Sequence, residues 1–175
     1  VCSSDLSPRS AAGVRDSFAY DAMHDPLTGL YNASAFDMLL KDADQEHIAI
    51  MIADIDGLRF MTEEHGKAVR DQVIRTVAEV MRSCFRSVDF ICRIRKDEFV
   101  IIMTRVDSSM RSLVFDKLDQ INEKLKTYDP SLPPISLSVG VAFADRDNPQ
   151  GDIFHDADTA LFRMREVRNS GCAVY

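Results

Sequence analysis

Several features that would point directly to a function are absent from this chain of 175 residues. It has no Walker, Gly-x-Gly-x-x-Gly or Ser-His-Asp signature, so it offers no P-loop, dinucleotide-binding turn or serine-hydrolase triad. No apolar run approaches the ~18 residues of a membrane span, and the chain does not begin with a basic segment followed by an apolar core. We therefore expect neither a membrane contact nor a signal peptide in this fragment.

Cysteine, histidine, glycine and proline are scarce. The four cysteines lie far apart without a Cys-x-x-Cys pair, which predicts free thiols in a reduced, cytoplasmic compartment. None of the four histidines stands at metal-ligand spacing from another histidine or a cysteine. Seven glycines and six prolines are too few for a fibrous or disordered chain, so we expect a packed core.

Positive charge is in deficit. Lysine and arginine number 21 against 28 acidic residues, and the resulting net charge of −7 argues against nucleic acid as a partner. With 46% hydrophobic and 28% charged residues, the composition is typical of soluble globular proteins. The length fits one domain and a short appendage.

The first two dozen residues differ from the rest. Residues 1–13 are small, polar and aperiodic, which predicts a disordered linker or an expression remnant. Residues 14–24 carry one apolar helical stripe that stops at Asp25-Pro26, so we expect a short lead-in helix there. The domain itself should occupy residues 25–175.

Within that domain, apolar runs alternate with amphipathic segments. Strands are predicted at 47–56, 89–94, 97–104 and 135–144, with a short strand at the C-terminus. Helical spacing marks the segments 69–84, 110–125 and 153–164. After the lead-in, the predicted order is helix, strand, two helices, two strands, helix, strand, helix, strand. This order predicts an α/β (α+β) fold, in which helices pack on a mixed sheet that includes a β-hairpin with a two-residue loop.

Acidic residues stand at the ends of two predicted strands. Asp54 and Asp56 close the first strand, and Asp97 and Glu98 open the strand after the hairpin. A buried carboxylate is costly unless it is paired or coordinates a cation, and oxygen ligands without histidine or cysteine favour Mg²⁺. Asp54 and Asp97 would share a divalent ion if their strands adjoin. Alternatively, these acids are solvated or cap the next helix.

Five segments in order resemble the motifs of one family. They are DPLTGLYN (25–32), DIDGLRFMTEEHG (54–66), RSVDFICRIRKDEF (86–99), SLSVGVA (136–142) and DADTALFRMREVRN (156–169). Together they resemble the GGDEF domain of diguanylate cyclases, which condense two GTP into cyclic di-GMP. The resemblance implies a nucleotidyl cyclase palm fold, Mg²⁺ or Mn²⁺ as cofactor, GTP or cyclic di-GMP as ligand, and a homodimer. It also implies an upstream sensory domain, whose signal the lead-in helix would deliver.

The resemblance assigns roles to individual positions. By this comparison the metal site comprises Asp54, Ile55 and Asp97, and Asp97 and Glu98 are catalytic if the domain is active. The implied nucleotide-binding residues are Arg59, Thr62, Asp71, Arg95, Lys96, Arg165 and Asn169. Arg86 and Asp89 match the Arg-x-x-Asp of the family's inhibitory product site, although such a pair also occurs by chance as a surface salt bridge.

The chain departs from the family at several of these positions. Arg95 and Lys96 replace the two glycines of the signature, Thr62 replaces an asparagine, and Asn169 replaces an arginine. A two-residue hairpin loop favours positive φ, so this Arg-Lys pair should strain the turn or adopt a different one. Two cations would still attract a triphosphate.

These departures predict a catalytically impaired regulatory module of cyclic di-GMP signalling, which binds cyclic di-GMP, GTP or both. One alternative is an active cyclase that works as a homodimer. The other is an interaction domain without a ligand.

Overall fold

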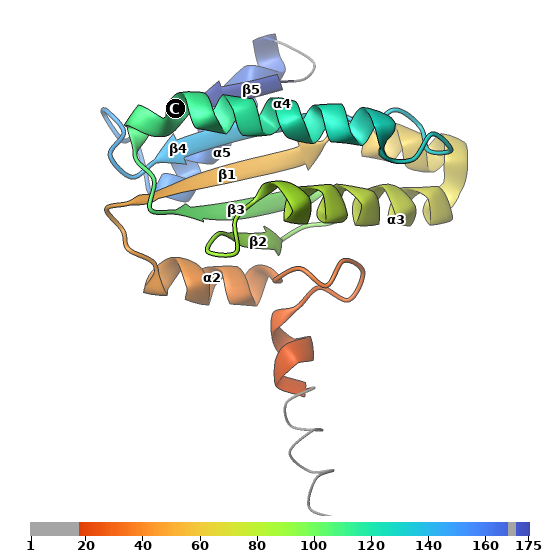
Figure 1. Cartoon of the computed structure of the whole chain (residues 1–175), viewed down its shortest axis with the longest axis horizontal. Helices are drawn as coiled ribbons and strands as arrows, with labels where there is room; N and C mark the ends of the chain where they lie inside the picture. The colour runs from red at the N-terminus through yellow and green to blue at the C-terminus, as the bar shows by residue number, and fades with distance from the viewer. Residues whose placement is uncertain (1–17, 168–170) are drawn as a thin grey trace, which may run out of the picture.

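The computed structural model describes residues 18–167 and 171–175, which form a five-stranded mixed sheet with helices on both faces (Figure 1). The strands are β1 (Ile48–Ile55), β2 (Phe90–Arg93), β3 (Glu98–Thr104), β4 (Leu137–Phe143) and β5 (Gly171–Val174). The helices are α2 (Ala33–Asp42), α3 (Leu58–Cys84), α4 (Arg111–Tyr128) and α5 (Ile153–Val167), with a 3₁₀ turn η1 at Ser108–Met110. Among the described helices, none is long and apolar enough to span a membrane.

This architecture confirms the predicted fold class and element order. The two helices predicted between the first two strands are present as α3, which begins at Leu58 and is broken at Gly66, where φ is 87°, so that the predicted helix at 69–84 lies in its second part. A glycine tolerates that conformation because it has no Cβ, so α3 is two helices joined by a kink. Helical backbone is also present at residues 18–23, whereas residues 1–13 and 14–17 lie outside the described residues.

The strand order is β2-β3-β1-β4-β5, and only the β4–β5 pair is parallel. Strand β1 lies at the centre and is buried along its whole length, which explains its continuous apolar sequence. Asp54, near the end of β1, is opposite Glu98 on β3 and Ser138 on β4. The two acidic strand ends therefore adjoin, which is the condition for a divalent ion shared between them.

Side chains alternate between two cores along each strand. Met51 and Ala53 face the core covered by α3 and α4, while Ile50 and Ile52 face the core covered by α2 and α5. Figure 1 shows α3 and α4 in front of the sheet and α5 behind it. By the same alternation, Asp54 belongs to the α5 face.

Helix α5 lies unusually close to β4. A Cβ built on Gly140 would be 2.3 Å from the carbonyl oxygen of Ala157 and 2.4 Å from the amide nitrogen of Leu161, both backbone atoms of α5. Glycine at this position therefore permits the close helix–sheet contact. That contact places α5 directly over the strands that carry the acidic residues.

The hairpin between β2 and β3 corrects the prediction of a two-residue loop. The ladder ends with Arg93 opposite Phe99, and the amides of Ile94 and Arg95 both donate to the carbonyl oxygen of Glu98. The turn thus has three residues, 95–97. Neither Arg95 nor Lys96 has positive φ, so the longer turn avoids the conformation that these two side chains disfavour.

Candidate functional site

A pair of buried carboxylates marks the candidate site on the α5 face. Asp54 and Glu98, opposite each other on β1 and β3, are only 8% and 6% exposed. Each has one buried oxygen, Oδ1 of Asp54 and Oε1 of Glu98, without a hydrogen-bond partner among the described residues. Asp56, by contrast, accepts hydrogen bonds from the hydroxyl groups of Ser136 and Ser138. Of the two acids at the end of β1, only Asp54 therefore has a buried carboxylate oxygen that can still accept a hydrogen bond or bind a cation.

Both members of the pair are harder to ionise than usual. Burial, together with the neighbouring charge of Asp54, raises the pKa of Glu98 to about 6. Burial also raises the pKa of Asp54, although Arg165 opposes that shift, and Asp97 and Asp158 add to it. Sequence reasoning missed Asp158, which α5 brings to the site from a distant part of the chain. The signal for it was its place in the segment DADTALFRMREVRN.

The open carboxylate oxygens fit a divalent cation. Hard oxygen ligands are what Mg²⁺ and Mn²⁺ prefer. No group of three or more His, Cys, Asp or Glu side chains within the described part of the chain has metal-binding geometry. For such a cation the protein would supply two carboxylates, Asp54 and Glu98, and further ligands would come from substrate phosphates, water or the backbone of Ile55.

Two arginines already approach these acids. Nη2 of Arg165 on α5 lies 2.7 Å from Oδ2 of Asp54, and Nε of Arg95 lies 3.9 Å from Oε1 of Glu98. The Arg95 side chain is 73% exposed, so solvent screens its charge and the contact is weak. Asp97 is exposed on the turn, and its carbonyl oxygen accepts the amide of Ile55. The predicted metal residues are thus neighbours, but Glu98, not Asp97, is the buried acid beside Asp54.

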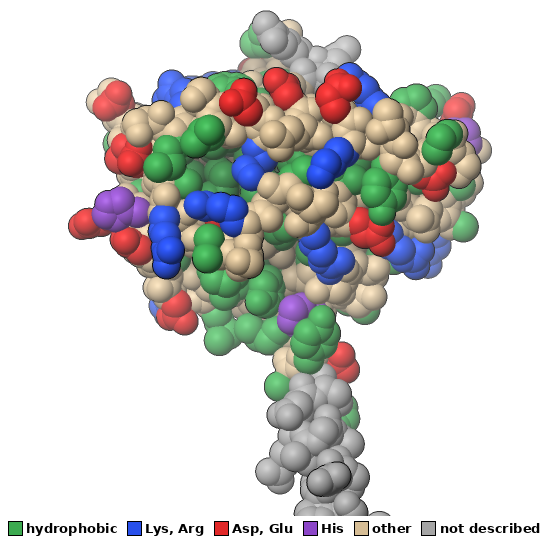
Figure 2. Space-filling model, in the orientation of Figure 1, with side chains coloured by type: hydrophobic (Ala, Val, Ile, Leu, Met, Phe, Trp, Pro, Cys, Tyr) green, Lys and Arg blue, Asp and Glu red, His purple; other side chains and the backbone are tan. Residues whose placement is uncertain are grey.

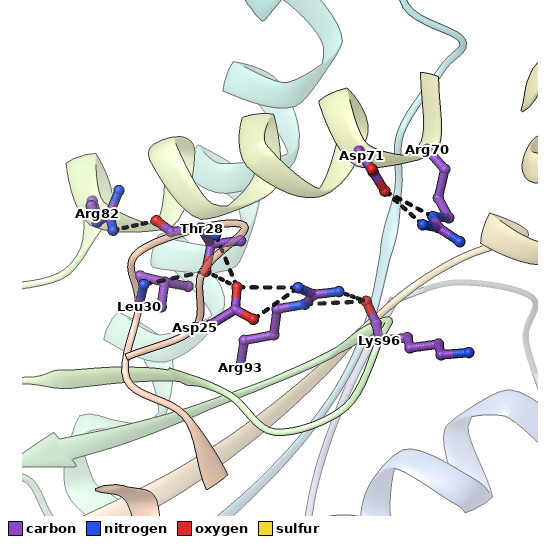
Figure 3. Close-up of polar contacts among 8 residues, drawn as sticks. All are labelled: Asp25, Thr28, Leu30, Arg70, Asp71, Arg82, Arg93 and Lys96. Carbon is purple, nitrogen blue, oxygen red and sulfur yellow. Dashed lines mark hydrogen bonds and ion pairs between the residues drawn. The ribbon is translucent and has the colours of Figure 1, made fainter. Parts of the chain in front are cut away.

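The hairpin tip is held by a network that the sequence did not reveal (Figure 3). Nε and Nη2 of Arg93 donate to the carbonyl oxygen of Lys96, while Nη1 donates to both carboxylate oxygens of Asp25 at 3.1 Å. Asp25 also accepts from the amide and the hydroxyl group of Thr28. Burial tends to raise the pKa of Asp25, but these hydrogen bonds hold it below its ordinary value. Asp25 therefore stays ionised and, through Arg93, fixes the backbone of the tip.

The nucleotide residues predicted on α3 lie on both sides of the kink at Gly66. Arg59 is 93% exposed and pairs with Glu63, and the hydroxyl group of Thr62 donates to the carbonyl oxygen of Leu58. Asp71 is bonded by the guanidinium of its neighbour, Arg70. Asn169 lies outside the described residues.

Arg86 and Asp89 form an ion pair whose carboxylate is buried, in contrast to an ordinary salt bridge on the surface. Nε and Nη2 of Arg86 donate to the two carboxylate oxygens of Asp89, whose side chain is 1% exposed. Asp89 also accepts the backbone amides of Arg86 and Thr104. These hydrogen bonds fix the carboxylate of Asp89, and the carboxylate in turn fixes the guanidinium of Arg86. The edge of the guanidinium that faces away from Asp89 is therefore held in one orientation.

Cavities of about 480 and 320 Å³ lie on the two sides of this pair. Arg86 and Asp89 line both, Arg82 adds a cation to the larger, and Lys117 adds one to the smaller. Figure 2 shows Lys and Arg side chains across the middle of the face formed by α3 and α4, although the chain as a whole is acidic. Sequence reasoning missed Arg82 and Lys117 because they belong to no motif and come to line these cavities only through the packing of the helices.

Fold and site together define a domain of the nucleotidyl cyclase palm type. The chain belongs to the GGDEF family, because the family profile described as "Diguanylate cyclase, GGDEF domain" matches residues 22–170. It is therefore a GGDEF domain of the cyclic di-GMP signalling family, as the sequence motifs predicted.

Individual relatives agree with this assignment. The chain is 28% identical over 164 residues to diguanylate cyclase TpbB of Pseudomonas aeruginosa and 24% identical over 158 residues to diguanylate cyclase DgcM of Escherichia coli. These matches cover 88% and 87% of this chain but only 38% of each relative, so the chain spans about two fifths of their length. A crystal structure of the coiled coil and GGDEF domain of DgcB from Caulobacter crescentus, in complex with c-di-GMP, matches with a TM-score of 0.78. That match has 26% identity and covers 95% of this chain and 96% of the crystallised chain.

Proposed function

We propose that this domain is a catalytically impaired module of cyclic di-GMP signalling that binds cyclic di-GMP, GTP or both. The observation that carries the proposal is the hairpin tip, where Arg95 and Lys96 form part of a three-residue turn without positive φ. Phosphoryl transfer depends on in-line alignment of the reacting groups, to within fractions of an ångström. A tip with two long side chains, fixed by Arg93, offers a different surface to a triphosphate than a bare backbone would.

Divalent metal binding is part of the same proposal. The open oxygens of Asp54 and Glu98 support a site for Mg²⁺ or Mn²⁺, with the backbone of Ile55 as a further ligand. These oxygens also argue against an interaction domain that has lost its ligands, since two buried carboxylates with unused acceptors cost stability unless something binds them. The same carboxylates favour the alternative of an active diguanylate cyclase.

Cyclic di-GMP would bind at Arg86 and Asp89. The fixed guanidinium edge, the two adjoining cavities and the cations Arg82 and Lys117 suit a ligand that carries two phosphates and two purine bases. The DgcB structure in complex with c-di-GMP gives this class of ligand a precedent among relatives. We further propose that the domain forms a homodimer and serves, in the cytoplasm, a longer protein with an upstream sensory domain.

The catalytic part of the proposal is tested with GTP and Mg²⁺. We expect no detectable cyclic di-GMP from the purified domain, because the tip does not align the two nucleotides. The double variant Arg95→Gly/Lys96→Gly should regain measurable turnover, since glycines restore a bare turn. Chromatography of the reaction products gives the readout. Robust product formation by the unaltered protein would establish the active cyclase instead.

The binding part is tested by calorimetry with cyclic di-GMP. Arg86→Ala should weaken binding about tenfold, which corresponds to ~1.4 kcal/mol, because a charge-assisted contact is lost. Asp97→Ala, at the hairpin, should leave binding nearly unchanged, since distant sites act independently. Circular dichroism of both variants controls for folding. If Asp97→Ala loses binding and Arg86→Ala does not, the ligand occupies the hairpin site; no binding by the wild type at millimolar ligand favours the interaction domain.

A further inference from the structure

Asp71 on α3 is paired with a cation of its own helix. Nε and Nη2 of Arg70 lie 3.0 and 2.7 Å from the same carboxylate oxygen, Oδ1, and Figure 3 shows the guanidinium turned toward the carboxylate. The two side chains are 27% and 21% exposed, so the pair is partly sheltered from water. Consecutive residues on a helix do not normally face each other, so Arg70 must fold back along the helix surface to make this contact.

The donors that Arg70 presents resemble those of a guanine base. Guanine offers a ring N–H and an exocyclic amino group side by side on its Watson–Crick edge, and a carboxylate is the natural acceptor for such an edge. A guanidinium also presents two adjacent N–H donors in one plane. Arg70 therefore occupies, from within the chain, one of the two carboxylate oxygens that a guanine edge would use, Oδ1.

We propose that Arg70 is a specificity-determining residue that competes with guanine for Asp71 and thereby weakens the binding of guanine nucleotides. The inference rests on the proposed function, that the domain binds guanine nucleotides, and on the family resemblance, by which Asp71 matches the acid that accepts hydrogen bonds from the guanine edge. An incoming guanine must displace the guanidinium of Arg70 from Asp71. Because Arg70 is the neighbouring residue in the chain, this competing donor is present at every binding event. The carboxylate is held ionised, because the hydrogen bond from Arg70 and then its charge lower the pKa of Asp71.

Another cation on the same helix provides a matched control. Arg75 is exposed, lies one turn beyond Asp71, and contributes positive charge to it without an assigned hydrogen bond. Loss of Arg75 removes a charge of the same kind as loss of Arg70, but leaves the Arg70–Asp71 pair in place. Comparing the two variants separates competition for the acceptor from general attraction of a phosphate.

The experiment is titration of GTP and of ATP, each with Mg²⁺, into the wild type, Arg70→Ala and Arg75→Ala. Alanine favours helix, so both variants should fold. We expect Arg70→Ala to bind GTP on the order of fivefold more tightly, as for loss of a partly exposed ion pair, with ATP binding unimproved. Arg75→Ala should bind GTP no better than the wild type. Adding Asp71→Asn to Arg70→Ala should abolish the gain.

The outcomes separate this inference from the function on which it rests. If Arg70→Ala binds GTP as the wild type does, or less tightly, Arg70 is no competitor and only the inference is overturned. Equal gains for GTP and ATP would also overturn it, since competition for a guanine acceptor must discriminate between the bases. If neither the wild type nor Arg70→Ala binds any guanine nucleotide at millimolar concentration, GTP binding under the proposed function fails as well.

Discussion

Asp156→Ala is expected to lower the free energy of unfolding by about 3–5 kcal/mol, because it removes one partner of a buried ion pair. The Asp156 side chain is fully buried, and its Oδ2 accepts from Nε of Arg146 at 2.6 Å. Its other oxygen accepts the amides of Gln150 and Gly151. The variant would leave the Arg146 guanidinium, 7% exposed, without its counter-charge.

Urea denaturation of the variant and of a matched control measures this effect. Lys126→Ala breaks an exposed pair, in which Lys126 and Glu123 are 64% and 70% exposed, and should cost less than about 1 kcal/mol. Because the buried pair anchors the start of α5, which carries Asp158 and Arg165, Asp156→Ala should also loosen the candidate metal site. Equal losses in the two variants would show that the buried pair contributes no more than a surface contact.

Glu98→Gln is expected to stabilise the metal-free domain by up to about 2 kcal/mol at pH 8. Glu98 has a pKa of about 6 in the folded state against an ordinary value of 4.5, mainly because it is buried and then because Asp54 is nearby. Each pKa unit corresponds to ~1.4 kcal/mol. At pH 8 the folded protein carries a charge that it disfavours, and the neutral amide removes it.

The sign of the pH dependence follows from the same shift. A folded-state pKa above the unfolded value means that the folded state holds the proton more tightly between pH 4.5 and 6. The contribution of Glu98 to stability is therefore full below about pH 4.5 and is lost as the pH rises through about 6. The difference between wild type and Glu98→Gln should vanish near pH 4. Unfolding curves in a chelator at several pH values measure this difference.

Metal binding should reverse the order of stability of the wild type and the Glu98→Gln variant. At the proposed site Mg²⁺ would bind the ionised pair in the folded state alone, so it should raise the melting temperature of the wild type at pH 8, but not that of Glu98→Gln. Asp97→Asn, at an exposed acid, is the control and should show a smaller change without metal. Equal stability of wild type and Glu98→Gln at pH 8 in chelator would contradict the argument.

Much of the fold was predictable because the central strands are covered on both faces. Such strands leave continuous apolar runs, and strand β1 was placed to within one residue at each end. The hairpin turn was not predictable, because its shape depends on Arg93, which is fixed by Asp25 from 68 positions away. Local sequence carries no information on a partner that distant.

The candidate site was predicted in outline. Asp54 and the signature acids do adjoin, but the buried acid opposite Asp54 is Glu98. Alternation along β3 was a usable signal for this, since Glu98 shares a face with Val100 and Ile102, which are apolar. The contact between Arg70 and Asp71 left no signal, because it depends on a side-chain conformation and not on spacing.

The position of β1 at the centre of the sheet also has a consequence for how the chain reaches its native state. Both neighbours of β1 follow it in sequence, β3 from residue 98 and β4 from residue 137. During synthesis, the apolar strand β1 therefore has two unpaired edges until its partners β3 and β4 have been synthesised. Long-range pairing of this kind slows folding and exposes the chain to aggregation while it waits. The residues that give the finished sheet its buried centre are thus the ones most exposed to misassociation in the nascent chain.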